Sequence, residues 1–248
     1  MEQKRNASVA IVGAGDFIGG AIARRFAAGG YRVHGGRRNA DKLATLEGEI
    51  VAAGGSFRGH ALDARDETSI SAFLDATNDD APLEVCVFNV GANVQFPVLD
   101  TTERVFRKVW EMACYAGFLT GREAARRMLP HGRGSIFFTG ATASLRGGKG
   151  YAAFGAAKAG LRSVAQSMAR ELHPQNIHVA HLVIDAGVDT AWVRERIAER
   201  AGREVADALP PDTLMELASI AETYWHLHGQ TRDAWTHELD LRPFGETW

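Results

Sequence analysis

Short runs of β-branched and aromatic residues alternate along the chain with longer segments in which apolar residues recur every three or four positions. The short runs predict strands at residues 8–12, 31–35, 57–62, 83–89, 134–139 and 177–184. The longer segments predict helices at residues 18–28, 40–53, 67–77, 102–129 and 151–172, and the segment 102–129 is long enough to be two helices. Strands that alternate with helices are typical of βαβ units with parallel strands.

Several predicted strands are apolar without strict alternation, which indicates that helices cover both faces of the sheet. Beyond residue 184 the pattern weakens and predicts a helix near 191–201, another near 212–228 and a strand at 234–239, with 191–217 as a candidate lid. No linker or repeat divides the chain. We therefore predict an α/β fold: a single doubly wound domain over residues 1–248, with a mostly parallel sheet of about seven strands and helices on both faces.

Composition narrows the classes of function. Hydrophobic residues make up 46% of the 248 positions, and the formal net charge of −2 gives no broad positive surface for nucleic acid. The two cysteines, Cys86 and Cys114, are too few for a disulfide framework or a metal cage, so we expect no metal and a cytoplasmic location. The sequence shows no apolar leader and no run long enough to cross a membrane. A small-molecule substrate is the expected partner.

A glycine-rich turn joins the first predicted strand to the first predicted helix. Glycine lets the backbone approach a pyrophosphate, whose charge is favoured by the N–H groups at the start of the helix. The spacing is Gly-x-Gly-x-x-x-Gly rather than the commoner Gly-x-Gly-x-x-Gly, so a tight turn without a ligand is the alternative. The residues expected to contact a dinucleotide here are Gly13, Gly15, Asp16, Phe17, Ile18 and Gly19.

The end of the second predicted strand bears on the choice of dinucleotide. An acidic residue there binds the ribose 2′-hydroxyl of NAD, whereas arginine accommodates the 2′-phosphate of NADP. The strand ends with Arg37 and Arg38, and guanidinium groups pair well with phosphate. We therefore expect NADP(H) to be preferred, with NAD(H) as the alternative. Asp16 would repel a 2′-phosphate, and the alternative interpretation of Arg37 and Arg38 is that they are solvated surface residues.

The order and spacing of these motifs, with others further along, resemble the short-chain dehydrogenase/reductase family over nearly the whole chain. Gly13, Ile18 and Gly19 resemble its glycine turn, and Lys158 resembles the lysine of its Tyr-x-x-x-Lys motif. Further similar positions are the carboxylate that reads adenine, the strand end that lies beneath the cofactor, and the segment that contacts the nicotinamide amide: Asp63 with Ala64, Asn89-Val90-Gly91, and Val188 with Thr190.

The resemblance implies a Rossmann-type fold, an NAD(P)(H) cofactor and hydride transfer to or from a carbonyl or alcohol. It also implies a homodimer or homotetramer formed through the helices at 102–129 and 151–172. In the family a tyrosine supplies the proton, a serine orients the carbonyl, an asparagine holds a relay water, and the lysine lowers the pKa of the tyrosine.

The sequence departs from the family at three of these four positions. Phe154 stands at the tyrosine position, Ala141 at the serine position and Cys114 at the asparagine position, whereas Lys158 is retained. Phenylalanine cannot donate a proton, so the usual mechanism is excluded. Lys158 lies within an apolar helical stripe, where its charge needs a partner, and ribose hydroxyls would supply one.

Other polar groups are candidates for the missing chemistry. Thr142 and Ser144 follow the fifth predicted strand and could bind a substrate oxygen, and Asp185 follows the sixth and could act as an acid or base. Tyr151 lies about two helical turns from Lys158, so the lysine would hardly reach it. With Lys158, these residues complete the candidate catalytic set. Each of them also has a structural interpretation as a turn, cap or pocket-lining residue.

Two functions remain open from the sequence. The first is an NAD(P)(H)-dependent oxidoreductase that acts on a small carbonyl or alcohol substrate by a variant proton-transfer arrangement. The second is an NADP(H)-binding pseudoenzyme that serves as a sensor or structural partner without turnover. An interaction module with an empty nucleotide site is a third, weaker alternative. Fold alone cannot decide among them, because function depends on the site.

Overall fold

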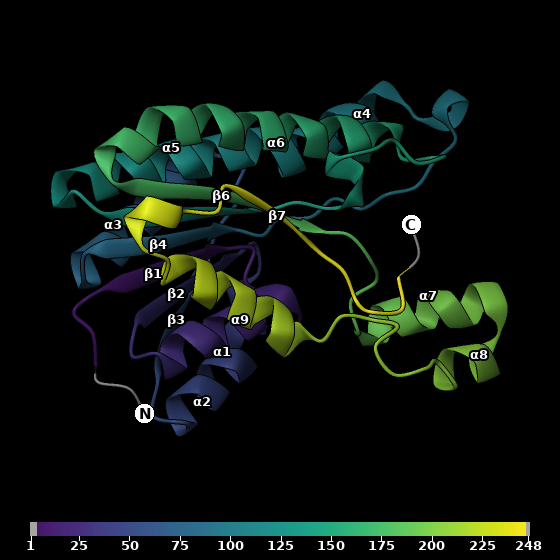
Figure 1. Cartoon of the computed structure of the whole chain (residues 1–248), viewed down its shortest axis with the longest axis horizontal. Coiled ribbons are helices and arrows are strands. Elements are labelled where there is room, and N and C mark those ends of the chain that lie inside the picture. The colour runs from purple at the N-terminus through teal and green to yellow at the C-terminus, as the bar shows by residue number, and fades with distance from the viewer. Residues whose placement is uncertain (1–3, 247–248) are drawn as a thin grey trace.

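A computed structural model of the chain describes residues 4–246 and contains one parallel sheet in the order β3-β2-β1-β4-β5-β6-β7 (Figure 1). Every neighbouring pair of strands in it is parallel. The predicted parallel sheet of about seven strands is therefore confirmed, and the predicted domain, 1–248, extends past the described residues at both ends. The strands are β1 Ser8–Val12, β2 Arg32–Arg37, β3 Ser56–Ala61, β4 Leu83–Phe88, β5 Gly134–Thr139, β6 Ile177–Ile184 and β7 Glu238–Leu241.

Helices cover both faces of the sheet, as Figure 1 shows. One face carries α1 Ile18–Ala28, α2 Ala44–Ala52 and α9 Leu217–His228, and the other carries α3 Glu67–Asp80, α5 Ala116–Met128 and α6 Ala152–Leu172. Successive residues of β1 show why this strand is apolar throughout, because Val9 and Ile11 pack into one core and Ala10 and Val12 into the other. No helix within the described residues is long and apolar enough to cross a membrane.

The strand order reverses between β1 and β4, and this reversal places the ligand crevice of a doubly wound sheet. The chain leaves β1 toward β2 on one side and leaves β4 toward β5 on the other, so a crevice opens beyond the carboxyl ends of these strands. Asn89 spans it, because its backbone N–H donates to the carbonyl oxygen of Val12 at 2.8 Å and its side-chain amide donates to that of Gly13 at 3.2 Å.

The main differences from the predicted elements lie within residues 102–129 and beyond residue 201. The segment 102–129, predicted as one helix or two, is α4 Glu103–Trp110, a π-helical turn Glu111–Tyr115 and then α5. The helix predicted at 212–228 begins at residue 217, because Asp212 has a positive φ of 61° and Met215 pairs with Val188. The last strand lies at 238–241 rather than 234–239, and the short helix α8 Arg203–Asp207 was missed.

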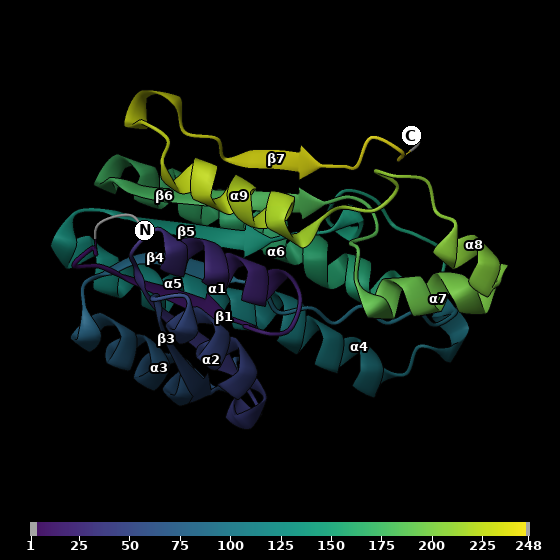
Figure 2. The ribbon, with the colours of Figure 1, turned by 90° about the horizontal axis from the view of Figure 1, so that it is seen from below.

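The segment predicted as a lid forms α7 Ala191–Ala201 and α8, which lie together beyond the carboxyl ends of the strands (Figure 2). None of the residues in α7 is fully buried. This helix therefore contributes little to either core and stands beside the crevice rather than against the sheet.

The backbone at Gly13 generates the first prediction. Gly13 has a φ of +92°, and a Cβ atom built on it would lie 2.8 Å from the carbonyl oxygen of Asn89. We expect Gly13→Ala to lower the free energy of unfolding by roughly 1–3 kcal/mol, because the left-handed conformation and the contact with backbone both oppose a side chain. The measurement is urea unfolding at equilibrium.

The neighbouring glycine is the control for this substitution. A Cβ atom on Gly15 would meet nothing within 4 Å and its φ is not positive. We expect Gly15→Ala to change the free energy of unfolding by no more than about 0.5 kcal/mol. Equal losses in the two variants would contradict the assignment of strain to Gly13.

Candidate functional site

Two adjoining cavities occupy the crevice at the carboxyl edge of the sheet. The first, here called the β1–β3 cavity, has a volume of about 580 Å³ and lies at the ends of β1, β2 and β3. The second, here called the β4–β6 cavity, has a volume of about 620 Å³ and lies at the ends of β4, β5 and β6. The two are neighbours, because both are lined by Asn89, Val90 and Gly91.

The glycine turn contributes to both cavities. Gly13 and Gly15 line the β1–β3 cavity, whereas Phe17 and Ile18 line the β4–β6 cavity. Gly19 lines neither and is packed so tightly that a Cβ atom on it would lie 2.5 Å from the carbonyl oxygen of Gly13. No side chain caps the first turn of α1. Its N–H groups can therefore bind an anion.

Arg37 carries a buried donor that lacks a hydrogen bond. Among the described residues, its Nη1 atom has no hydrogen-bond partner, and the Oδ1 atom of the exposed Asp16 lies 3.5 Å away. Arg38 and Lys42 line the same cavity, whereas Asp16 does not. With Arg65, which is paired with Asp63, four cations line the cavity, and one guanidinium donor stays available, an arrangement that fits a phosphate.

The carboxylate of Asp63 is held by a residue that the sequence analysis missed. Arg65 donates from Nε to Oδ1 at 2.9 Å and from Nη2 to Oδ2 at 2.6 Å. These bonds hold the pKa of the Asp63 carboxyl below its ordinary value. Both residues and Ala64 line the β1–β3 cavity. A carboxylate has about four acceptor positions, so Asp63 keeps capacity for a further donor. The short Asp-x-Arg spacing was the signal available for this pair.

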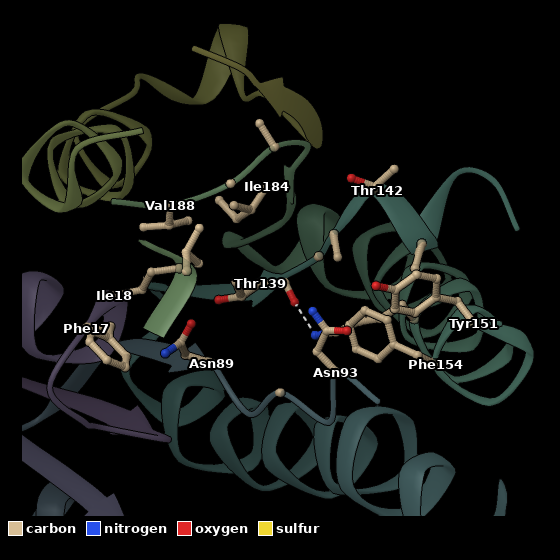
Figure 3. A pocket seen from close by; sticks show the side chains of 18 of the residues that line it. Phe17, Ile18, Asn89, Asn93, Thr139, Thr142, Tyr151, Phe154, Ile184 and Val188 are labelled. Carbon is tan, nitrogen blue, oxygen red and sulfur yellow. Dashed lines mark hydrogen bonds between the residues drawn. The ribbon is translucent and has the colours of Figure 1, made fainter. Parts of the chain in front are cut away.

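Lys158, on α6, is buried in the wall of the β4–β6 cavity. Its side chain is 3% exposed, and its Nζ atom donates to the carbonyl oxygen of Thr139 at 2.7 Å and to that of Val90 at 3.4 Å. The bond to Thr139 is the dashed line in Figure 3. Burial lowers the pKa of the Lys158 ammonium to about 8. The ammonium has three donors, and one remains for a ligand.

The positions that depart from the family pattern form an apolar wall beside Lys158. Phe154 is 6% exposed and packs with Cys114 and Ala141 in a small core. Cys114 lies in the π-helical turn, and burial raises the pKa of its thiol. The Phe154 ring lies 5.9 Å from Nζ of Lys158, close enough for a favourable cation–π contact. None of these three side chains is a proton donor of useful acidity.

The structure brings together two of the remaining candidates and sets two others aside. Tyr151 and Thr142 line the β4–β6 cavity with Lys158, and Figure 3 shows the Tyr151 hydroxyl turned toward the cavity beside Phe154. Ser144 does not line it, because its hydroxyl accepts a hydrogen bond from the Ala141 N–H at 3.1 Å. Asp185 does not line it either. That carboxylate is 1% exposed and is paired with two arginines.

The far wall of the β4–β6 cavity comes from the segment after β6. Val188 and Thr190 line it as expected, and the Thr190 hydroxyl also caps α7 by accepting from the Val193 N–H at 3.1 Å. Several lining residues were not expected from the sequence. They are Asn93, Thr139, Ala143, Arg146, Gly148, Ile184, Ala186, Gly187, Trp192 and Val193. Most carry no chemical signal in the sequence, because an apolar lining residue looks like any core residue.

Comparison with known proteins adds independent information. Residues 7–201 match the short chain dehydrogenase family. A 3-oxoacyl-[acyl-carrier-protein] reductase, MabA, from Mycobacterium bovis is 31% identical over 198 residues, which cover 78% of this chain and 75% of the relative. An NADPH-dependent 1-acyldihydroxyacetone phosphate reductase from Saccharomyces cerevisiae is 27% identical over 192 residues, 76% of this chain and 63% of that protein.

Solved structures agree with these matches. A short-chain dehydrogenase from Rhodopseudomonas palustris is 56% identical, with a TM-score of 0.83 over 97% of this chain and 100% of that chain. A metagenomic short-chain oxidoreductase in complex with NADP is 26% identical, with a TM-score of 0.79 over 96% of this chain and 97% of that chain.

The burial of Lys158 predicts a particular dependence of stability on pH. Burial lowers the pKa of its ammonium from the ordinary 10.5 to about 8. Below pH 8 the lysine is charged in both states, and the folded protein bears the full cost of the buried charge. Between pH 8 and 10.5 the unfolded state binds more protons, so this contribution to stability rises with pH.

Substitution by methionine isolates that contribution from other groups. We expect wild type to gain roughly 2–3 kcal/mol of unfolding free energy relative to Lys158→Met between pH 7 and pH 10. The measurement is urea unfolding of both proteins across this pH range. Parallel pH profiles would show that Lys158 keeps an ordinary pKa.

Proposed function

Because this chain belongs to the short-chain dehydrogenase/reductase family, we propose that it is an NADP(H)-dependent oxidoreductase acting on a small carbonyl or alcohol substrate. The observation that carries the proposal is the buried ammonium of Lys158, which lines the β4–β6 cavity and is held by two carbonyl oxygens, one of them from Val90, which borders both cavities. A charge is costly to bury without partners, and a nicotinamide ribose in this cavity would supply one for its remaining donor. When bound, NADPH supplies a hydride from its nicotinamide ring.

The β1–β3 cavity supports the choice of NADP(H). Gly13 and Gly15 let the backbone approach a pyrophosphate, and the uncapped first turn of α1 offers N–H groups to it. Arg37, Arg38 and Lys42 would hold a 2′-phosphate. The relative solved with NADP and the yeast relative named as NADPH-dependent support the same choice, with NAD(H) as the alternative.

The proton must come from a group other than Phe154. We assign the acid role to Tyr151, because a phenol is far more acidic than an aliphatic hydroxyl and this side chain lines the cavity. Thr142 would then donate a hydrogen bond to the substrate carbonyl. As the carbonyl is reduced, the Tyr151 phenol would give its proton to the carbonyl oxygen, and this partly exposed tyrosine would regain a proton from solvent.

One set of observations favours the pseudoenzyme as the second candidate. Phe154, Ala141 and Cys114 replace the tyrosine, serine and asparagine of the family pattern, while Lys158 and the glycine turn keep the cofactor features. A protein of this kind would bind NADP(H) and act as a sensor or structural partner, without oxidising or reducing the cofactor.

We also propose a homodimer or homotetramer, formed through the long helices on one face of the sheet. Phe106 and Trp110 on α4 and Phe118 on α5 are each about two-fifths exposed, at 42%, 42% and 39%. Large exposed aromatic side chains that lie along one face commonly mark protein contacts.

The function is tested by a fluorescence titration of wild type with NADPH and NADH, followed by a panel of ketones, aldehydes and quinones. We expect NADPH to bind, and its affinity to fall by about tenfold or more in Lys158→Met, since a charge-assisted hydrogen bond contributes roughly 1.5–3 kcal/mol. Lys149→Met, which removes an exposed lysine from a nearby loop, is the matched control and should bind as wild type does. Unchanged affinity in Lys158→Met would reject the role of this lysine.

Turnover separates the two candidate functions. Oxidation of NADPH by a carbonyl compound, lost in Tyr151→Phe, would support the enzyme and its assigned acid. Binding without turnover, with activity gained in the double variant Phe154→Tyr and Ala141→Ser, would favour the pseudoenzyme. Absence of NADPH and NADH binding would overturn both.

The choice of cofactor gives a separate prediction. We expect Arg37→Asp to reverse the preference for NADPH over NADH, because the new carboxylate repels a 2′-phosphate and accepts from a 2′-hydroxyl. Arg58→Asp makes the same charge change on the exposed side of β3, outside both cavities, and should keep the preference. The measurement is the ratio of dissociation constants for the two cofactors. A retained preference in Arg37→Asp would assign the selectivity to other residues.

A further inference from the structure

The charged side chains that line the β4–β6 cavity are all positive. Among the described residues that line it, the charged side chains are Lys158 and Arg146, and none is a carboxylate. The Lys158 ammonium is already bound by the carbonyl oxygens of Thr139 and Val90. Arg146 is therefore the cation that this cavity offers to a second ligand.

Asp185 and the backbone of Thr142 hold Arg146 in place. Its Nη2 atom donates to both carboxylate oxygens of Asp185, at 3.1 and 3.2 Å, and its backbone N–H donates to the carbonyl oxygen of Thr142 at 3.2 Å. Asp185 is 1% exposed and also pairs with Arg242, so the carboxylate cannot turn away. An anchored guanidinium loses little conformational freedom when it binds a ligand.

Other donors of the same guanidinium are available. Within residues 4–246, neither Nε nor Nη1 of Arg146 forms a hydrogen bond, and the side chain is 50% exposed. Asp185 is shared between two arginines, so it offsets the charge of Arg146 only in part. Nε and Nη1 lie on different edges of the guanidinium, so each can donate a separate charge-assisted hydrogen bond to a carboxylate or phosphate oxygen.

We propose that Arg146 binds an anionic group of the substrate, so that the preferred substrates are carbonyl compounds bearing a carboxylate or phosphate. The inference rests on the proposed function, because it assigns the substrate class of the same cavity. The other residues that line this cavity are mainly apolar and include Phe154, Ile184 and Val188. A short hydrocarbon segment between the carbonyl and the anionic group fits that lining.

The test compares matched pairs of acid and ester with NADPH as reductant. The probes are 2-oxobutanoate, 4-oxopentanoate and 5-oxohexanoate, each beside its methyl ester, and dihydroxyacetone phosphate beside dihydroxyacetone. We expect wild type to show a kcat/KM at least tenfold higher for one charged member than for its neutral partner. The carboxylate and phosphate pairs show which anion is preferred.

Variants connect that preference to Arg146. We expect Arg146→Gln to bring the ratio of charged to neutral substrate close to one, mainly through KM, and Arg146→Lys to keep part of it. Lys149→Gln removes a positive charge from the same loop and should keep the wild-type ratio. Thermal unfolding checks that Arg146→Gln folds, since Asp185 retains Arg242 as a partner. A wild-type ratio near one, or a high ratio kept by Arg146→Gln, overturns the proposal.

A binding measurement separates this proposal from the proposed function. Calorimetric titration of the protein with NADP⁺ and 4-oxopentanoate or its ester needs no turnover. Binding of the acid that Arg146→Gln weakens tenfold, without reduction of any probe, would support the anion site while contradicting the enzymatic function. Reduction of neutral esters without a preference for acids would support the enzymatic function and contradict the anion site.

Discussion

The buried ammonium of Lys158 is the interaction on which the site depends. It joins α6 to the carbonyl oxygen at the end of β5 and to that of Val90, just beyond β4, so one cation fixes a helix against two strand ends. Removal of a charge from water is unfavourable, and the carbonyl dipoles offset only part of that cost. A ligand with hydroxyl groups would complete the coordination. The folded chain therefore keeps an ammonium donor that favours such a ligand, although Phe154 has replaced the usual acid.

Much of the fold could be predicted because it follows from local patterns. The bounds of β1, β5, β6, α1 and α7 agree with the predicted ones, since each of these elements has a clear apolar pattern between glycine or polar residues. The parallel direction of the strands also followed from their alternation with helices. The errors concentrate where backbone geometry departs from the pattern, as in the π-helical turn and at Asp212, whose left-handed conformation delays the start of α9.

The candidate site was predicted less completely, for a related reason. Motif spacing located Gly13, Lys158 and Thr190 at the cavities, because these positions depend on strand ends and helix starts. The sequence could not show that Asp185 pairs with Arg146, since the partners are 39 residues apart and meet only through the sheet. Nor could it show that Ser144 turns back to its own backbone. Polar residues that belong to no sequence pattern acquire their roles from tertiary contacts, which exist only in the folded chain.

The bridge made by Asn89 has a consequence for how the two cavities communicate. Its backbone and side-chain amides are bound to the last residue of β1 and to the first glycine of the turn, and the same asparagine borders both cavities. A ligand that moved the turn would therefore also move the wall of the neighbouring cavity. Each ligand would then change the affinity of the protein for the other, by the same factor in both directions.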